Sequence, residues 1–197
     1  MDELILTYEQ LYFLGEILKA KYIDYRYIKA MQDIQKQYIY LKNKNISELL
    51  GAGVLQEDFS GNLKVLPVYE ALLSPIFFGE EETCVETSDG QAYLFHQKEG
   101  EQTAVAVVEN QLHIRPIKDI FAETSSILKK IFVAQKVVDI SCKYAKIGVG
   151  GVEQQLSSEE KGIYVKDEHG KQRPVTADEA INLVLDTWLR GGFSYEL

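Results

Sequence analysis

The stretch Thr83–Ile117 constrains the fold most, because it reads as four β-strands separated by three turns. Asp89-Gly90 accepts positive φ at both positions, so it predicts a tight type I′ turn between antiparallel strands. Gly100 and Asn110 mark the two turns that follow. Small and β-branched residues fill both faces of residues 103–109, which predicts a central strand covered on both sides. The sequence therefore predicts an antiparallel β-meander.

Helical patterns lie on both sides of this meander. Thr7 and Gln10 fit a capping box that starts a helix to about Ala20. Residues 118–135 form a strongly amphipathic pattern, which we expect to lie across the meander. Thr176 and Glu179 make a second capping box, at the start of a helix to Leu189. The predicted fold class is α+β, an antiparallel β-meander covered by amphipathic helices, with an N-terminal helical segment.

The N-terminal segment carries further helix signals. Asp24 can cap a helix that reaches Leu41, and Ile46–Ala52 reads as a separate short helix. Two short strands then surround the turn Asp58–Asn62. Pro67 is suited to the first position of another helix, which Ser74-Pro75 is expected to end.

The C-terminal part contains one ambiguous segment and one predicted linker. Residues 137–147 could extend the preceding helix or form a strand, because their periodicity fits both. Residues 148–160 are rich in glycine, serine and glutamate and predict a flexible linker. Residues 162–175 read as a hairpin that turns at His169-Gly170.

The length and composition predict a single domain over residues 1–197. A chain of 197 residues with 46% hydrophobic residues can bury one sizeable core, or two small cores that share an interface. Within this domain we expect a helical part at about 1–78, sheet plus helix at 83–147, a linker at 148–160, and a hairpin with a helix at 162–197.

The charge balance predicts a protein partner. Lysine and arginine number 21 against 30 acidic residues, giving a formal charge of −9. This argues against binding to nucleic acid or to an anionic membrane surface. The start Met1-Asp2-Glu3 does not fit a secretory leader, and no apolar run approaches the roughly 20 residues that span a bilayer. We therefore predict a cytoplasmic location, with Cys84 and Cys142 more plausibly reduced and buried than paired.

No catalytic, metal-binding or cofactor-binding motif is found. His96, His113 and His169 fall in separate strands and turns, without the spacing of a helical metal site. The glycine cluster at 148–151 lacks the Lys-Ser/Thr ending of a phosphate-binding loop. Cys142 has no basic neighbour in the sequence that would mark it as a nucleophile. We predict that the chain is not an enzyme and uses no cofactor.

A basic stretch leaves a second interpretation open. Residues 19–44 hold seven Lys or Arg against two Asp, with tyrosines interleaved. Helices followed by a small β turn are also the order of a winged-helix nucleic-acid-binding regulator. The would-be recognition helix Ile46–Ala52 has no Arg or Lys to reach bases or phosphates, so this remains the alternative.

Three segments resemble the N-terminal part of EspG-type proteins, the cytosolic chaperones of type VII (ESX) secretion. They are Leu4–Leu14, Leu49–Leu55 and Gly61–Pro75, and the likeness covers roughly the first 120 residues. The order of elements, with helices before a β-meander, is similar too. The resemblance implies a non-enzymatic adaptor that holds a helical secretion substrate in the cytosol.

The candidate partner-binding residues are three tyrosines of the basic stretch, Tyr22, Tyr25 and Tyr40. Aromatic anchors of this kind provide much of the affinity in protein interfaces. Partial burial of the same tyrosines in the core fits the sequence at least as well. A homodimer through a strand edge is also possible, because the meander must end in unpaired backbone groups.

Overall fold

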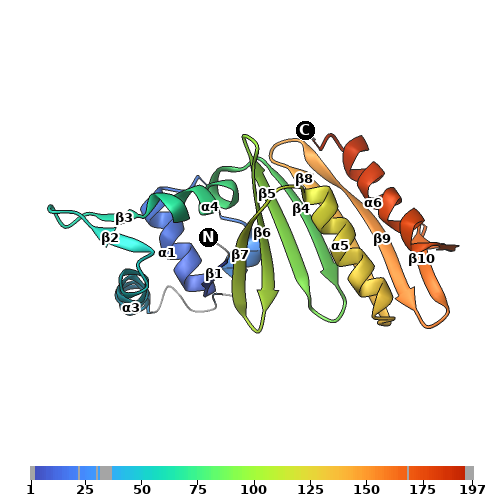
Figure 1. The fold of residues 1–197 in the computed structure, drawn as a ribbon, viewed down its shortest axis with the longest axis horizontal. Coiled ribbons are helices and arrows are strands. Elements are labelled where there is room, and N and C mark those ends of the chain that lie inside the picture. Colours follow the sequence, from blue (N-terminus) through green and yellow to red (C-terminus); the bar gives the residue numbers. More distant parts are fainter. Residues whose placement is uncertain (1–2, 22, 30, 32–36, 168, 194–197) are drawn as a thin grey trace.

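The computed structural model describes residues 3–21, 23–29, 31, 37–167 and 169–193 and is built around a large antiparallel sheet (Figure 1). The nine strands of this sheet follow the order β1-β7-β6-β5-β4-β8-β9-β10-β11. The predicted meander is confirmed as β4 to β7, and the α+β class is confirmed with it. The strands are β1 (Leu4–Leu6), β4 (Glu81–Thr87), β5 (Ala92–Lys98), β6 (Glu101–Val108), β7 (Gln111–Ile117), β8 (Val138–Lys146), β9 (Gly150–Glu159), β10 (Gly162–Lys166) and β11 (Gln172–Val175).

The sheet extends beyond the meander at both of its edges. At one edge, β1 pairs with β7 through Leu4 opposite Ile114 and Leu6 opposite Leu112. At the other edge, β8 pairs with β4 along its length, and β9 to β11 follow. The segment 137–147, for which the sequence left helix and strand open, therefore contains the strand Val138–Lys146.

The predicted linker at 148–160 is wrong, because most of it forms β9, which pairs with β8 and β10. The glycines and serines within β9 are residues of a paired strand and do not form a flexible linker. A Cβ at Gly151 would lie 2.5 Å from the Tyr144 carbonyl oxygen, so the close approach of β8 requires glycine there. Leu156 is fully buried and Ser157 is 2% exposed.

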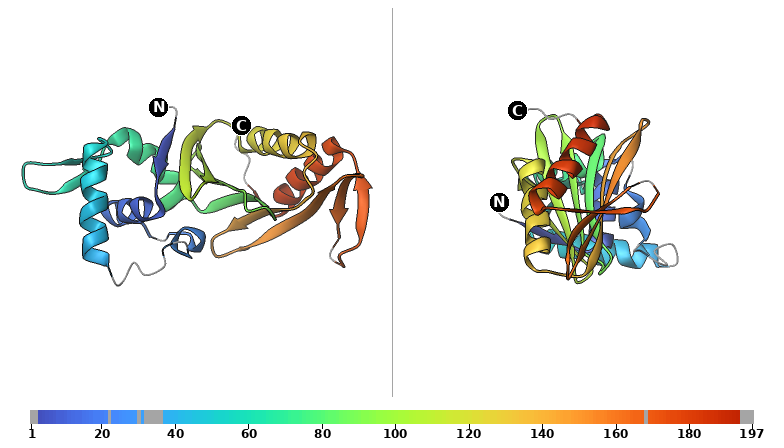
Figure 2. Two further views of the ribbon diagram at one scale, coloured as in Figure 1. Left: turned by 90° about the horizontal axis from the view of Figure 1, so that it is seen from below. Right: turned by 90° about the vertical axis from the view of Figure 1, so that its right-hand side faces the viewer.

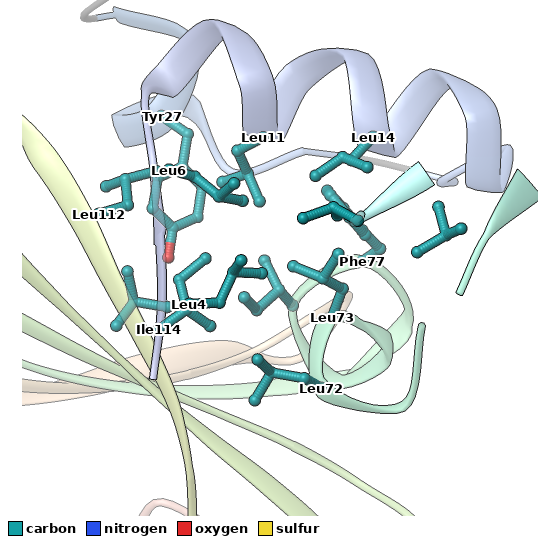
Figure 3. Close-up of a cluster of buried hydrophobic side chains, with 14 of the residues drawn as sticks. Leu4, Leu6, Leu11, Leu14, Tyr27, Leu72, Leu73, Phe77, Leu112 and Ile114 are labelled. Atoms are coloured by element: carbon teal, nitrogen blue, oxygen red, sulfur yellow. The ribbon is translucent and has the colours of Figure 1, made fainter. Parts of the chain in front are cut away.

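The two faces of the sheet carry two hydrophobic cores. Leu94, Val105 and Ile114 belong to the first core, and Phe95 and Ala104 belong to the second. Because successive strand residues point to opposite faces, β6 contributes to both cores, as expected for a central strand. Figure 3 shows part of the first core, where Tyr27 enters beside Leu6 and Leu112.

The first core is covered by the N-terminal helices, at one end of an elongated molecule (Figures 1 and 2). The helix α1 (Tyr8–Leu18) begins as predicted. The Gln10 amide donates to Thr7 Oγ1, and Gln10 Oε1 accepts from the Thr7 amide. A short α2 (Tyr25–Lys29) and a longer α3 (Tyr38–Gly51) follow.

The prediction of one helix from Asp24 to Leu41 and another over Ile46–Ala52 is wrong. Instead, α3 begins at Tyr38 and continues to Gly51, so the gap left between the two predicted helices is itself helical. Asn45 is buried, and its side-chain Nδ2 donates to the Leu41 carbonyl at 2.8 Å. This bond satisfies the amide inside the helix, so tertiary burial overrides the low helix propensity of asparagine.

The helix α4 (Pro67–Phe78) also continues past its predicted end at Ser74-Pro75. An internal proline removes a backbone donor and costs a helix about 3 kcal/mol. Ile76 is 4% exposed and Phe77 is fully buried. Burying each of these side chains contributes about 1.5–3 kcal/mol, enough to keep the last turn helical. Before α4, β2 (Leu55–Glu57) and β3 (Leu63–Val65) pair around the predicted turn.

The second core lies under α5 (Ile120–Val133) and α6 (Ala177–Arg190), on the other face of the sheet. Figure 1 shows both helices in front of the strands. As predicted, α5 crosses the meander, and Asp119 caps its first turn. Thr176 caps α6, but only half of the predicted capping box forms, since Glu179 pairs with Arg173 at 2.7 Å.

Candidate functional site

A groove of about 330 Å³ lies between α5 and the second-core face of β5, β6 and β7. Its floor comes from the sheet and its wall from α5. The apolar lining residues are Tyr93, Phe95, Ala104, Val105, Ala106, Ile127, Ile131 and Ala134. We call this feature the α5 groove.

The strand register explains why the sheet is hollowed here. Tyr93 lies opposite Ala106, which lies opposite His113, which lies opposite Ile5. These four residues form one row across the strands, with a methyl group between two larger side chains. Since Ala104 precedes Ala106 on the same face of β6, two small residues leave a hollow that α5 does not fill. At the border of this face, Ile5 is 48% exposed.

The rim of the groove carries charges that are mostly paired. Arg115 Nη2 lies 2.5 Å from Glu123 Oε1, and Lys136 Nζ lies 3.2 Å from Asp89 Oδ2. His113 Nδ1 lies 3.2 Å from Glu3 Oε2. Lys130 forms no ion pair with any residue that the structure describes, so it leaves one uncompensated positive charge at the rim.

An apolar floor within a charged rim suits the binding of apolar side chains from a partner. Aliphatic and aromatic residues supply the lining, and the rim can orient what enters. The described residues contain no group of three His, Cys, Asp or Glu side chains that could hold a metal ion. Its apolar lining offers recognition by shape and hydrophobic contact.

The sequence-predicted tyrosines lie elsewhere. Tyr25 on α2 is 71% exposed and Tyr40 on α3 is 66% exposed, and neither lines the α5 groove. Tyr22 falls outside the described residues. A role for these tyrosines in partner binding stays a prediction. The sequence analysis missed the groove because its hollow depends on strand register, although the alternation of Ala104 and Ala106 was legible in β6.

A charged cluster fixes α2 to the sheet on the side of the first core. Arg26 forms ion pairs with Asp24, Glu82 and Glu86. Burial alone would lower the pKa of Arg26, but its hydrogen bond to Asp24 and the surrounding negative charge raise it. For Asp24, burial alone would raise the pKa, but the hydrogen bonds from Arg26 and its positive charge lower it. Lys143 lies 2.9 Å from Glu86 and extends the cluster onto β8.

The histidines and cysteines are separated by the sheet. His96 is buried in the first-core region, His113 lies at the groove rim, and His169 lies in the exposed turn between β10 and β11. Cys84 and Cys142 are free and buried as predicted. They belong to the two different cores, on opposite faces of the sheet, and burial raises the pKa of both thiols.

Among the described helices none has the length and apolar character needed to span a membrane.

The architecture defines a known class of fold, that of the EspG-type chaperones of type VII secretion. The chain is similar to a solved structure, that of the Mycobacterium tuberculosis type VII secretion system chaperone EspG5 in complex with the PE25–PPE41 dimer. The TM-score is 0.66 at 8% sequence identity, and the alignment covers 96% of each chain. No family model matches the sequence, and no curated protein matches it either. At this identity the likeness establishes the fold alone. It confirms the resemblance predicted from the sequence and extends it beyond the first 120 residues or so to the C-terminal strands and α6.

Proposed function

We propose that the protein is a non-enzymatic chaperone that holds a helical protein of type VII secretion in the cytoplasm, with the α5 groove as its binding site. The observation that carries this proposal is the apolar groove beside a helix on an EspG-type fold. EspG5 was solved together with a PE25–PPE41 dimer, which supports a protein as the partner here.

The groove suits a helix better than an extended peptide. Its wall is one face of α5, from which Ile127, Ile131 and Ala134 face the hollow at spacings of four and three residues. A partner helix lying along α5 would present its own apolar residues at the same spacing. The floor of small residues permits close approach. We expect an interface of standard size, about 800 Å² per partner.

The alternative function, a winged-helix-like nucleic-acid-binding regulator, is less well supported by the surface of α3. Lys44 and Glu48 on its exposed side lie 3.9 Å apart as an ion pair. Such a pair offers phosphates little net positive charge. The chain as a whole carries a formal charge of −9.

The test is to measure affinity for the small helical secretion substrates encoded in the same genome, using isothermal titration calorimetry. Ala106→Trp fills the floor of the groove, and we expect it to weaken binding at least about tenfold. The matched control is Ala122→Trp, because Ala122 is exposed on α5 and does not line the groove. Equal affinity of both variants would place the binding site elsewhere, and no binding by the unmodified protein would refute the proposal.

A further inference from the structure

The β2–β3 hairpin carries an exposed aromatic residue at its tip. Phe59 is exposed to an extent of 113%, the largest value among the exposed hydrophobic residues described. Figure 1 shows the hairpin standing out from the N-terminal helices at one end of the molecule. Only its base enters the first core, through Leu55 and Val65.

The turn that presents Phe59 is held by hydrogen bonds. Asp58 Oδ1 accepts from the backbone amides of Ser60 at 2.9 Å and Asn62 at 3.0 Å. The Asp58 amide donates to the Asn62 carbonyl at 2.9 Å, and Gly61 adopts a φ of +80°. Backbone hydrogen bonds lower the pKa of Asp58 to about 2, so this carboxylate stays ionised in the turn. A tip fixed in advance loses little entropy when it binds.

The tip and the α5 groove are complementary in character. Phe59 is apolar, and the groove has an apolar floor and a volume of about 330 Å³. Glu57, two residues before Phe59, is exposed and forms no ion pair with any described residue. At the rim of the groove, the uncompensated charge is the cation Lys130. One chain thus carries both an exposed anchor with a free negative charge and a hollow with a free positive charge.

We propose that two copies of the chain associate by inserting Phe59 of each copy into the α5 groove of the other. A reciprocal arrangement closes as a two-fold dimer, because each copy gives one hairpin and receives one. Each inserted ring would remove roughly 150–250 Å² of surface from water, typical of an interface anchor. With only two such contacts the dimer is weak, with a dissociation constant in the micromolar range, about 1–100 µM.

The proposal has a consequence for regulation, which rests on the function proposed above. The groove that holds the helical partner would be capped by a second copy when no partner is present. Capping keeps an apolar surface out of contact with other proteins. Partner and second copy would then compete for the same floor, so partner binding would release monomers.

The test is sedimentation equilibrium of the purified full chain between about 1 and 200 µM, a range that brackets the expected dissociation constant. We expect a monomer–dimer equilibrium that Phe59→Ser weakens at least about tenfold. The matched control is Val149→Ser, since Val149 is 72% exposed in the turn between β8 and β9. Phe59 lies in solvent at the tip of the monomer, so its substitution should leave thermal unfolding unchanged at concentrations well below the dissociation constant.

A charge swap separates this dimer from any other. Lys130→Glu alone should weaken association about threefold, and the double variant Glu57→Lys with Lys130→Glu should restore it. A protein that stays monomeric at all concentrations would overturn the proposal, as would a dimer that Phe59→Ser leaves intact. Because no partner is added, these outcomes are independent of the affinity test for helical substrates.

Discussion

The Tyr27 hydroxyl lies 2.9 Å from His96 Nε2, joining α2 to β5 across 69 residues of sequence. Both side chains are buried, with exposures of 2% and 4%. His96 Nδ1 faces Glu82 Oε2 at 3.6 Å, which favours the proton on Nδ1 and leaves Nε2 to accept from the tyrosine. This bond anchors the short helix α2 beneath the sheet.

Tyr27→Phe should destabilise the protein by about 1–3 kcal/mol, because it leaves a buried imidazole nitrogen without its partner. The midpoint of urea unfolding, followed by circular dichroism, measures this loss. The control is Tyr40→Phe, which removes a hydroxyl from a side chain that is 66% exposed and should have almost no effect. Equal midpoints for the two variants would mean that the Tyr27–His96 bond contributes nothing to stability.

Stability should fall as the pH falls from about 6.5 to 4. Burial lowers the pKa of His96 from 6.5 to about 4. In this window the unfolded chain binds a proton that the folded chain does not, so acidification favours unfolding, by about 3 kcal/mol at most. The free energy of unfolding measured at intervals of pH should show this slope.

His96→Gln should flatten that slope, since the variant has no group that titrates at this position. His169→Gln should retain it, because His169 lies in an exposed turn. The pKa of Asp24 is lowered from 3.8, so this carboxylate contributes stability that is lost only below about pH 3.8. That loss lies outside the pH window in which His96 titrates. If the slope persists in His96→Gln, groups other than His96 cause it.

Gly79→Ala should destabilise the protein by about 1–3 kcal/mol, the usual cost of overpacking. Gly79 follows α4 with a φ of −68°, which any residue can adopt, so space alone requires glycine. A Cβ there would lie 2.4 Å from the Pro75 carbonyl oxygen and 2.6 Å from that of Gln97, both backbone atoms. Thermal unfolding measures the loss. Gly51→Ala is the control, as its Cβ would meet nothing within 4 Å, and a similar loss there would refute the steric explanation.

The sequence predicted those parts of the fold that local chemistry determines. Asp89-Gly90 specifies its turn within two residues, and Thr7 with Gln10 specifies a helix start within four. The meander, α1 and α6 were found for this reason, whereas α5 was found from its amphipathic periodicity. Such signals need no knowledge of the rest of the chain.

The errors fall where distant contacts decide the structure. Pro75 signals the end of a helix, but α4 continues through it because burial stabilises the last turn. The gap left between the predicted helices ending at Leu41 and beginning at Ile46 is likewise helical, where Asn45 is buried. The glycines and serines of β9 resemble a linker until β8 and β10 pair with it. The α5 groove arises from the alignment of Ala106 with residues of β5 and β7. That alignment depends on strand register, which only the assembled sheet reveals.

Two buried threonines should respond in opposite ways to replacement by valine, which has nearly the same shape. Thr103 Oγ1 donates to the Leu72 carbonyl at 2.8 Å, joining β6 to α4, so Thr103→Val should destabilise the protein by about 1 kcal/mol. Thr124 Oγ1 is buried in α5 without a hydrogen-bond partner among the described residues. Thr124→Val removes an unsatisfied polar atom and should be neutral or stabilising by up to about 1 kcal/mol. Urea unfolding at an unchanged m-value measures both effects. A loss in Thr124→Val as large as that in Thr103→Val would show that an ordered water satisfies the Thr124 hydroxyl.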